Sequence, residues 1–473
     1  MKTLFKKSLP RKHSLCYLCK DPSQPSLQRA GVQMGNRDKS IIPHSTFTLG
    51  LSRFFSFKLK KMKKRNAILA LALLGCNITF AQNHVIHSTN ISSLQVVAGT
   101  DWLAPLPIIS LGDNKAIHID FDDLTHEYHR YTYTLTHCEA DWTETQGLFT
   151  SDYAEGFSDG LTIDNVEESV NTNQLYTHYS LQIPNRNCNI KMSGNYKLTI
   201  YDENNDNTPV ITACFLVAEP RASVKMNVTT NTDIDINKQH QQVDVQLNYG
   251  NVNVTNPTTQ IKSVLLQNGN WHTARWNIHP QQITKDGLQW THCRDYIFDA
   301  GNEYHKFETL DVNHTTMGIE DISWDGEWFN AYLFTDEPRL NYLYDEDANG
   351  AFYIRNSDND NNDTFCEYIK VHFKLKTPYC GRHIYVNGRF TNGVFNSSTE
   401  MTYNHDTNCY EKELTLKQGY YSYQYLVEMS KGNYAPVDTE GNFYQTENQY
   451  TSLIYYKGTG ERADKLIAHA EAY

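Results

Sequence analysis

Apolar and polar residues alternate along much of this chain, and this alternation constrains the fold more than any other sequence feature. A two-residue period places successive side chains on opposite faces of a β-strand, one on a core and one in water. Such half-buried strands are typical of antiparallel sheets, and the Tyr, Val, Ile, Thr and Phe side chains used here suit a pleated surface. The pattern is clearest in residues 116–121, 131–135, 179–183, 196–201, 243–247 and 369–375.

Clusters of Asn and Gly separate the alternating runs and favour tight turns. They include Asn204–Asn207, Asn268–Asn270, Asn349–Gly350 and Asn387–Gly388. The one stretch with helical character is the tail, Glu461–Ala472. We therefore predict an all-β protein of tandem antiparallel β-sandwich domains, immunoglobulin-like or E-set-like, with a short C-terminal helix.

Three sandwich segments are expected. The first, residues 82–220, ends where a strand runs into Glu219-Pro220 and a new strand begins. The second spans residues 221–355, and the polar stretch at 356–364, which holds no apolar residue, is interpreted as a linker. The third segment spans residues 365–473.

A secretory signal is predicted at residues 62–81. Three cations, Lys63–Arg65, precede the apolar run Ala67–Leu74, and small side chains at Thr79 and Ala81 favour cleavage before Gln82. The apolar run is about half of the roughly 20 residues that a membrane-spanning helix needs, so an anchor and a short buried helix are the weaker interpretations. A competing cleavage before Cys76, in a lipobox-like sequence, would give a lipoprotein. Either cleavage exports the protein from the cytoplasm.

Translation is expected to start at Met62, because a signal peptide belongs at an N-terminus. Residues 1–61 are then a mis-annotated extension or a disordered basic one. Residues 1–81 hold 16 of the 42 basic and 2 of the 54 acidic residues, which leaves a net charge of −26 on the remainder. Such an acidic body repels phosphate, so nucleic acid is not an expected partner, and neither is direct lipid binding unless Cys76 is lipidated.

Seven cysteines, an odd number, are scattered beyond residue 81 without a CxxC pair. We interpret these cysteines as buried free thiols, with at most one disulfide among them. No nucleophile elbow, phosphate loop or dinucleotide fingerprint occurs, so neither an enzyme nor a cofactor is predicted. The segment His118–Cys138 is rich in Asp and His, but its spacing matches no known metal motif, and a metal site there is the weaker interpretation.

A weak calcium signal occurs at Asp345, Asp347 and Asn349, which resemble the first half of an EF-hand loop. The twelfth position of that loop requires Glu, and Asn356 stands there instead. The favoured alternative is a hairpin turn at Asn349-Gly350.

Tyr421, Tyr423 and Tyr425 share one face of a predicted strand. Such an aromatic strip can bind a sugar or a partner protein, which makes these residues candidates for partner binding. Core packing is the favoured alternative, because Tyr fits a half-buried sheet.

An ordered series of short motifs resembles the type IX secretion system plug protein family of Bacteroidetes over residues 90–468. The motifs are Tyr128–Tyr133, His137–Trp142, Tyr176–Tyr179, Ser193–Tyr196, Gln267–Gly269, Gly301–Glu303, Leu416–Tyr421 and Thr446–Tyr450. The resemblance implies a non-enzymatic periplasmic subunit, monomeric within a complex, at the inner face of the outer membrane. Its partner would be a large outer-membrane β-barrel translocon, whose lumen it closes by steric occlusion.

The third segment is also similar to glycogen-binding and isoamylase N-terminal sandwiches, through Ile384–Phe390 and Gly419–Val427. A periplasmic carbohydrate-binding protein is therefore the alternative function, and an uncharacterised hydrolase is a further one. Those modules bind glucan with tryptophans, and residues 365–473 contain none.

Overall fold

The computed structural model describes residues 83–156 and 159–473. The extension at 1–61, the signal peptide at 62–81 and both candidate cleavage sites lie outside these residues. The described chain is nearly all β, in several antiparallel sheets that are consistent with tandem β-sandwiches, so the predicted fold class is confirmed.

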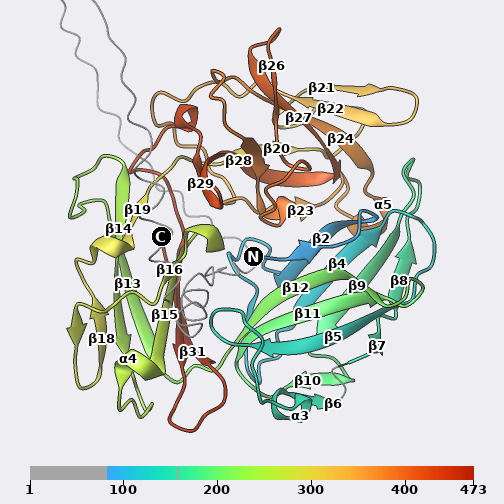
Figure 1. Cartoon of the computed structure of the whole chain (residues 1–473). Helices are drawn as coiled ribbons and strands as arrows, with labels where there is room; N and C mark the ends of the chain where they lie inside the picture. Colours follow the sequence, from blue (N-terminus) through green and yellow to red (C-terminus); the bar gives the residue numbers. More distant parts are fainter. Residues whose placement is uncertain (1–82, 157–158) are drawn as a thin grey trace, which may run out of the picture. The chain divides into compact units, whose positions relative to one another are not determined.

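A ten-stranded sheet combines strands from the beginning, the middle and the end of the chain (Figure 1). Its path is β16-β15-β30-β31-β12-β11-β5-β7, and β1 and β3 pair with β12. The pairings of β12 with β31 and β3 are parallel and the others are antiparallel. The bounds are β1 Val85–Ile86, β3 Ile108–Ser110, β5 Tyr131–Cys138, β7 Leu161–Thr162, β11 Gly194–Asp202, β12 Thr208–Ala218, β15 Ile261–Gln267, β16 Arg275–Trp276, β30 Tyr450–Tyr456 and β31 Lys465–Ala472.

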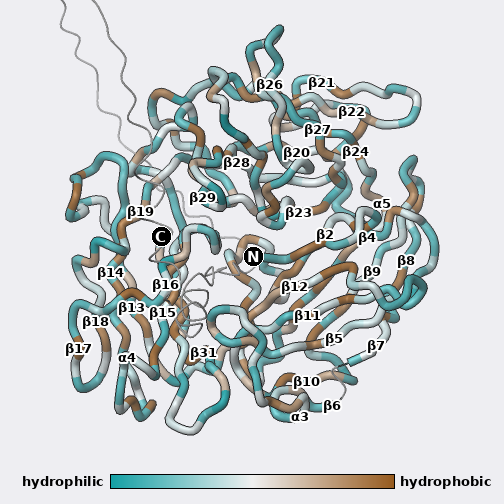
Figure 2. Tube along the Cα trace, in the orientation of Figure 1, coloured by the Kyte–Doolittle hydropathy of each residue, from teal (hydrophilic) through white to brown (hydrophobic). Residues whose placement is uncertain are grey.

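The first sandwich packs a four-stranded sheet, β2-β4-β9-β8, against β5, β11 and β12 of the large sheet. Its core alternates as predicted: Ile117, Ile119 and Phe121 of β4 are buried. Figure 2 shows hydrophobic residues along β11 and β12 and hydrophilic residues in the connecting loops. The bounds are β2 Ile91–Ala98, β4 Ile117–Asp123, β8 Asn165–Glu168 and β9 Thr177–Ile183, with a separate pair β6 Ala154–Gly156 and β10 Cys188–Ile190.

The second sandwich packs the sheet β13-β14-β18-β17, with β19 on β14, against β15, β30 and β31. Its core combines Val243 and Val245 of β14 with Ile454 and Ile467, which come from the end of the chain. The opposite face of the same large sheet is also buried, in a cluster that includes Leu216. The bounds are β13 Ser223–Thr229, β14 His240–Asn248, β17 Gln282–Ile283, β18 Gly287–Trp290 and β19 Ile297–Asp299.

The third sandwich packs the sheet β20-β28-β23, with β25 and β29 on β28, against the sheet β21-β22-β24-β27-β26. Alternate residues of β24 fill its core, as the pattern at 369–375 predicts. The bounds are β20 His305–Glu308, β21 Ile319–Trp324, β22 Phe329–Leu333, β23 Phe352–Ile354, β24 Tyr368–Leu375, β25 Ile384–Asn387, β26 Thr402–Asn404, β27 Cys409–Lys417, β28 Gly419–Ser430 and β29 Asn433–Pro436.

Helices are short throughout the described chain. They are the α-helices α3 Thr150–Tyr153, α4 Pro257–Gln260 and α5 Asn362–Phe365, and the 3₁₀ turns η2 Trp271–Thr273, η3 Arg294–Tyr296, η4 Arg389–Thr391 and η5 Asp438–Glu440. Among residues 83–156 and 159–473, no helix has the length and apolar character needed to cross a membrane.

The predicted C-terminal helix is wrong. Residues 465–472 form β31, which pairs in register with β30 from Lys465 opposite Tyr456 to Ala472 opposite Tyr450. Alanine and glutamate favour a helix by only a fraction of a kcal/mol per residue. Pairing with β30 and burial of Leu466 and Ile467 outweigh that preference.

Strand pairing also crosses the segment boundaries proposed from the sequence. β20, β21 and β22 precede residue 355 but belong to the sheets of the third sandwich. β30 and β31 follow residue 365 but pair with β15 and complete the second sandwich. The polar stretch at 356–364 contains the start of α5, whose Thr364 carbonyl accepts a hydrogen bond from the backbone of Val170. The grouping of strands into sheets therefore does not follow the three segments expected from the sequence, 82–220, 221–355 and 365–473.

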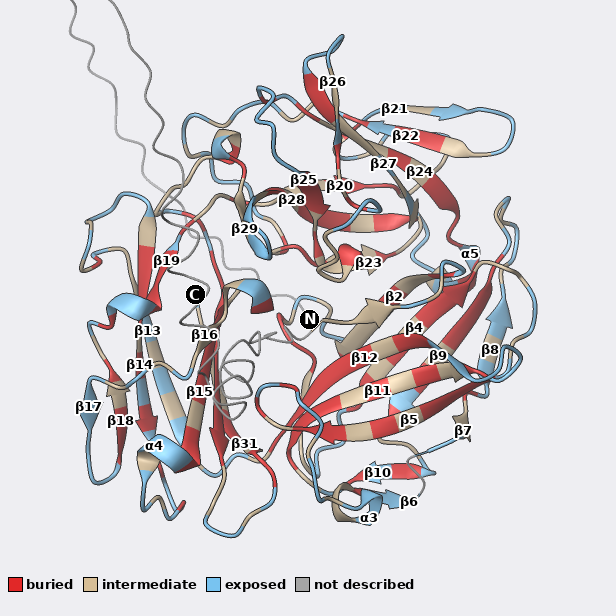
Figure 3. Ribbon diagram, in the orientation of Figure 1, coloured by how far each residue is buried: buried red, intermediate tan, exposed pale blue. Residues whose placement is uncertain are grey.

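Two of the exposed edge strands carry charged side chains. β8, β17 and β21 are edge strands and are largely exposed (Figure 3). Glu167 and Glu168 lie on β8, and Glu320 and Asp321 lie on β21. Charge on an edge strand discourages pairing with another chain, because the incoming strand would have to desolvate it.

Candidate functional site

The three candidate calcium ligands lie on the long loop between β22 and β23, where the carboxylates of Asp345 and Asp347 have other partners. Asp345 accepts a hydrogen bond from the ammonium of Lys306 at 2.6 Å. Asp347 accepts hydrogen bonds from the backbone amides of Asn349 and Tyr304, and burial raises its pKa to about 6. Among the described residues, no group of three or more Asp, Glu, His or Cys side chains is arranged to hold a metal ion.

The Asn349-Gly350 pair forms a tight turn. Both residues have positive φ angles, 48° and 81°, as the turn interpretation requires. A hairpin also needs a strand before the turn, and none lies between β22 and β23, so the turn leads into β23 but does not close the expected hairpin.

Polar residues of the segment His118–Cys138 are distributed among several separate contacts. Asp123 accepts a hydrogen bond from the hydroxyl of Tyr131 at 2.8 Å, and His129 lies 3.0 Å from Asp202. His137 contacts the hydroxyl of Thr145. These side chains do not converge on a common point, which is what a metal site requires.

The tyrosine strip on β28 lies inside the third sandwich. Tyr421, Tyr423 and Tyr425 are 1%, 2% and 0% exposed. The hydroxyls of Tyr423 and Tyr425 donate to the same carboxylate oxygen of Asp336, at 2.9 and 2.6 Å, and the hydroxyl of Tyr421 donates to the carbonyl of Lys417. A partner cannot contact rings at these depths. The three candidate partner-binding residues therefore belong to the core.

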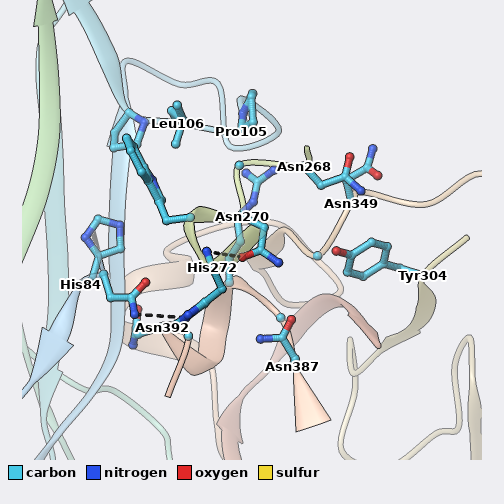
Figure 4. Close-up of a pocket in the computed structure, with 18 residues that line it drawn as sticks. His84, Pro105, Leu106, Asn268, Asn270, His272, Tyr304, Asn349, Asn387 and Asn392 are labelled. Atoms are coloured by element: carbon cyan, nitrogen blue, oxygen red, sulfur yellow. Dashed lines mark hydrogen bonds between the residues drawn. The ribbon is translucent and has the colours of Figure 1, made fainter. Parts of the chain in front are cut away.

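A cavity of about 130 Å³ lies where loops of all three sandwiches meet (Figure 4). Asparagine amides dominate its wall, and Arg389 of η4 lies at its edge. The guanidinium of Arg389 donates to the carbonyls of Ala104 at 2.6 Å, Leu103 at 3.3 Å and Trp102 at 3.4 Å. The polar lining includes Asn83, His84, Asn268, Asn270, His272, Tyr304, Asn349, Asn387 and Asn392.

The chemistry available in this cavity is hydrogen bonding. Burial lowers the pKa of His84 to about 4 and also lowers the pKa of His272, so both imidazoles are neutral at neutral pH. Burial lowers the pKa of Arg389 only to about 10, which leaves it charged and committed to its three carbonyls. No carboxylate is among the described residues that line the cavity.

Two motifs of the plug-like series meet at this cavity. The side chain of Asn268 donates to that of Asn448 at 2.7 Å, and its own oxygen accepts from the backbone of Gln449 at 2.8 Å. Gly269 has a φ of 68°, and a Cβ there would lie 2.4 Å from the carbonyl oxygen of Pro105. The glycine is therefore required by the close approach of the β2–β3 connection.

Two further motifs meet on the large sheet. The amide of Asn195 donates to the carbonyls of Glu139 and Ala140, at 3.0 and 3.2 Å. The hydroxyl of Tyr455 donates to the oxygen of Asn195 at 2.8 Å. These motif residues satisfy buried backbone groups where strands distant in sequence meet, which is a structural task.

Comparison with known proteins decides the family. No curated protein matches the chain. The sequence model of a family described as "Type 9 secretion system plug protein 1st domain" matches residues 91–219. The crystal structure of a hypothetical protein from Parabacteroides merdae is 38% identical, with a TM-score of 0.79, and the match covers 82% of this chain and 98% of that chain. The chain belongs to the type IX secretion system plug protein family.

Membership gives this plug-family protein a role related to type IX secretion. It suggests a structural secretion component rather than an enzyme, and it implies association with a secretion translocon. It also suggests a periplasmic location.

A buried ion pair joins the first and third sandwiches of this plug-family protein. The ammonium of Lys417, at the end of β27, lies 2.7 Å from a carboxylate oxygen of Asp122 on β4. It also donates to the carbonyl of Asp363 at 2.7 Å and lies 4.1 Å from the ring centre of Tyr176. The ammonium is therefore surrounded by acceptors, as a buried charge requires.

Asp122 has further partners within the same junction. His178 donates to its second oxygen at 2.7 Å, and the hydroxyl of Tyr368, which also lies 2.7 Å from Ser93, donates to the oxygen that Lys417 contacts. Burial opposes ionisation of Asp122, but the charge of Lys417 and the hydrogen bond from His178 outweigh it and lower its pKa. Sequence reasoning missed this junction, because residues 122 and 417 carry no local signal that relates them.

A second buried cluster lies within the third sandwich. His305 of β20 lies 2.9 Å from Asp336 and 2.8 Å from Glu440, and Glu440 also pairs with Arg339. Burial opposes protonation of His305, but its two carboxylate neighbours outweigh it and raise its pKa to about 9. The pKa values of Asp336 and Glu440 are lowered, because His305 outweighs their own burial. These residues therefore form a cluster of paired charges inside the third sandwich.

The cysteines of the plug-family protein match the sequence interpretation in part. All seven within the described residues are unpaired. Six are buried, and Cys380 is exposed. Its sulfur lies 3.4 Å from the hydroxyl of Tyr410.

Proposed function

We propose that this protein closes a type IX translocon barrel from its periplasmic side when no substrate is passing. The mechanism is steric: a preformed body docks at the lumen and leaves as a unit when transport begins. The family membership supports the role in secretion, and the way the three sandwiches are joined supports the mechanism.

The joining of the three sandwiches is the observation that carries the proposal. The large sheet runs through the first two sandwiches, and β30 and β31 return to it from beyond the third. The Lys417–Asp122 pair and the contacts of Arg389 with the β2–β3 connection then hold the third sandwich to the first. Domains connected only by linkers move relative to one another by default. Sandwiches joined by these contacts resist such relative motion. A protein that prevents solutes from leaking through a pore needs this rigidity.

A conductance measurement tests the proposal directly. The purified translocon barrel is placed in a planar bilayer in a known orientation, and residues 82–473 are added to one side. We expect conductance to fall when the protein is added to the periplasmic side, and not when it is added to the opposite side. An unrelated acidic β-sandwich protein of similar mass is the control. Unchanged conductance from both sides would exclude closure of the barrel.

A second test uses the outer membrane of living cells. Deletion of the gene is expected to admit large hydrophilic molecules, and the unmodified gene is expected to restore the barrier. An intact barrier in the deletion strain, with no second plug-family gene present, would contradict the proposal.

Carbohydrate binding is the alternative, and the structure brings two tryptophans to the third sandwich that the segment 365–473 lacks. They are Trp324 and Trp328, on and beside the β21–β22 hairpin. The ammonium of Lys370 lies 5.4 Å from the ring centre of Trp328, and Tyr332 stacks on His372 at 4.4 Å. Sugar stacking needs an exposed ring, and Trp324 is 47% exposed, with its ring centre 4.7 Å from that of Phe329. A glycan array decides this alternative, and specific binding that Trp324→Ala abolishes would support it.

A further inference from the structure

The loop between β22 and β23 presents two leucines to solvent. Leu340 is 83% exposed and Leu343 is 81% exposed, and the adjacent Tyr344 is 54% exposed. Single exposed apolar residues are common on protein surfaces. Here three large apolar side chains, two of them almost fully exposed leucines, fall within five residues. Their arrangement therefore needs a physical account.

The same loop is fixed to the body by residues that lie between and on either side of the leucines. The backbone of Arg339 donates to the carbonyl of Thr439 at 2.8 Å, and its guanidinium donates to the carbonyl of Glu303 at 2.5 Å. The hydroxyl of Tyr342 donates to the carboxylate of Glu303 at 2.6 Å, and Asp345 pairs with Lys306.

The inward residues thus hold the segment while the leucines point away from the body. A segment held in this way loses little conformational entropy when a partner binds. Most of the free energy gained by burying its exposed apolar side chains can therefore contribute to affinity.

The surroundings of the leucines are acidic. Glu346 lies two residues after Tyr344 in the sequence. The charge of Glu447 is the main cause of the raised pKa of the Tyr344 hydroxyl, so Glu447 also lies near it. Both glutamates are exposed, and neither forms an ion pair with another residue of the described chain. An apolar projection with an acidic rim is complementary to an apolar pocket rimmed by lysine or arginine.

We propose that Leu340 and Leu343 anchor the protein to an apolar pocket with a basic rim on its translocon partner. This proposal rests on the proposed function and names the part of the surface that docks. It replaces the buried tyrosines of β28 as the partner-binding element.

Binding of residues 82–473 to the purified translocon barrel in detergent tests the anchor. Leu340→Glu/Leu343→Glu is expected to weaken binding at least 100-fold, because two anchors are lost and two charges are introduced beside an acidic rim. Ile234→Glu/Ile236→Glu is the matched control, since these isoleucines are 54% and 63% exposed on the β13–β14 loop. We expect the control to bind within threefold of the unmodified protein. Raising the salt concentration is expected to weaken binding of the unmodified protein.

The outcomes separate the two proposals. If the unmodified protein and the leucine variant bind equally, the anchor is overturned and the proposed function stands. If the unmodified protein does not bind the barrel, both are overturned. Thermal unfolding checks that the variant folds, and Leu340→Ser/Leu343→Ser replaces it if the charged version does not. Sedimentation of the unmodified protein completes the test: a dimer that the leucine variant abolishes would assign the loop to self-association and overturn docking to the translocon.

Discussion

The ammonium of Lys417 and the carboxylate of Asp122 lie 2.7 Å apart, and their side chains are only 2% and 1% exposed. The two residues are separated by almost 300 positions and belong to different sandwiches. An ion pair at this depth makes the relative position of the two sandwiches specific, because a shifted packing that still excludes water would leave each buried charge without its partner.

Lys417→Met is therefore expected to destabilise the protein strongly. Removing one member of a buried pair typically costs about 3–5 kcal/mol, since the remaining charge loses its partner. Lys376→Met is the control, because its pair with Glu337 is more than half exposed and such pairs contribute less than about 1 kcal/mol. Urea unfolding followed by tryptophan fluorescence measures both. The double variant Asp122→Asn/Lys417→Met is expected to recover at least half of the loss, and equal stability of the two single lysine variants would refute the role of the pair.

Stability is expected to decrease between pH 6.5 and pH 9. The pKa of His305 is about 9 in the folded protein and about 6.5 when unfolded, so protonated His305 stabilises the fold fully below pH 6.5, and the effect is lost as pH rises through about 9. The shift corresponds to roughly 3 kcal/mol. At the acidic end, Asp336 and Glu440 have lowered pKa values, so their contribution is lost as pH falls below the range of ordinary carboxylates.

Unfolding free energies of His305→Gln measured across this range test the assignment. The variant is expected to be less stable at pH 6 and to show a shallower decline toward pH 9. His314→Gln is the control, because His314 is 78% exposed and pairs only with Asp311. A decline as steep as that of the unmodified protein would show that another group causes it.

Arg389→Lys is expected to loosen the β2–β3 connection. Lysine cannot reach three successive carbonyls with one planar group, and each charged hydrogen bond that is lost costs on the order of 1.5–3 kcal/mol. Hydrogen–deuterium exchange is expected to become faster in residues 99–107 and to stay unchanged in β13 and β14. Arg382→Lys, on an exposed turn, is the control. Unchanged exchange in residues 99–107 would mean that Arg389 does not hold this connection.

One thiol of the folded protein is expected to react quickly with Ellman's reagent. Residues 82–473 contain seven cysteines, and six of them are buried in a packed interior that excludes the reagent. Cys380→Ser is expected to remove the fast phase, whereas seven thiols react in guanidinium. Two or more fast thiols in the folded protein would show that part of the core opens readily.

The motif series that carried the family resemblance has a structural explanation. Asn195, Asn268 and Asn448 each satisfy backbone or side-chain groups where distant strands meet. Residues with that task are restricted by geometry, because an asparagine amide both donates and accepts at fixed positions. This is why a plug-like series could be recognised without a catalytic motif.

Most of the strands could be predicted from local sequence, because the two-residue period of a half-buried strand is a local property. Ile117–Phe121 and Ile369–Leu375 are examples in which the pattern predicted both the strand and its buried face. The tail showed the limit of local reasoning. Its alanines favour a helix weakly, and only β30, which pairs with it, makes it a strand.

Which strands share a sheet, and which polar residues meet, could not be predicted from the sequence. The sequence separates β15 from β30, and Asp122 from Lys417, by well over a hundred residues, and no local pattern encodes such a pairing. Local sequence also does not show that the tyrosines of β28 are buried or that Leu340 and Leu343 are exposed. Burial depends on what packs over a residue, and those neighbours come from elsewhere in the chain.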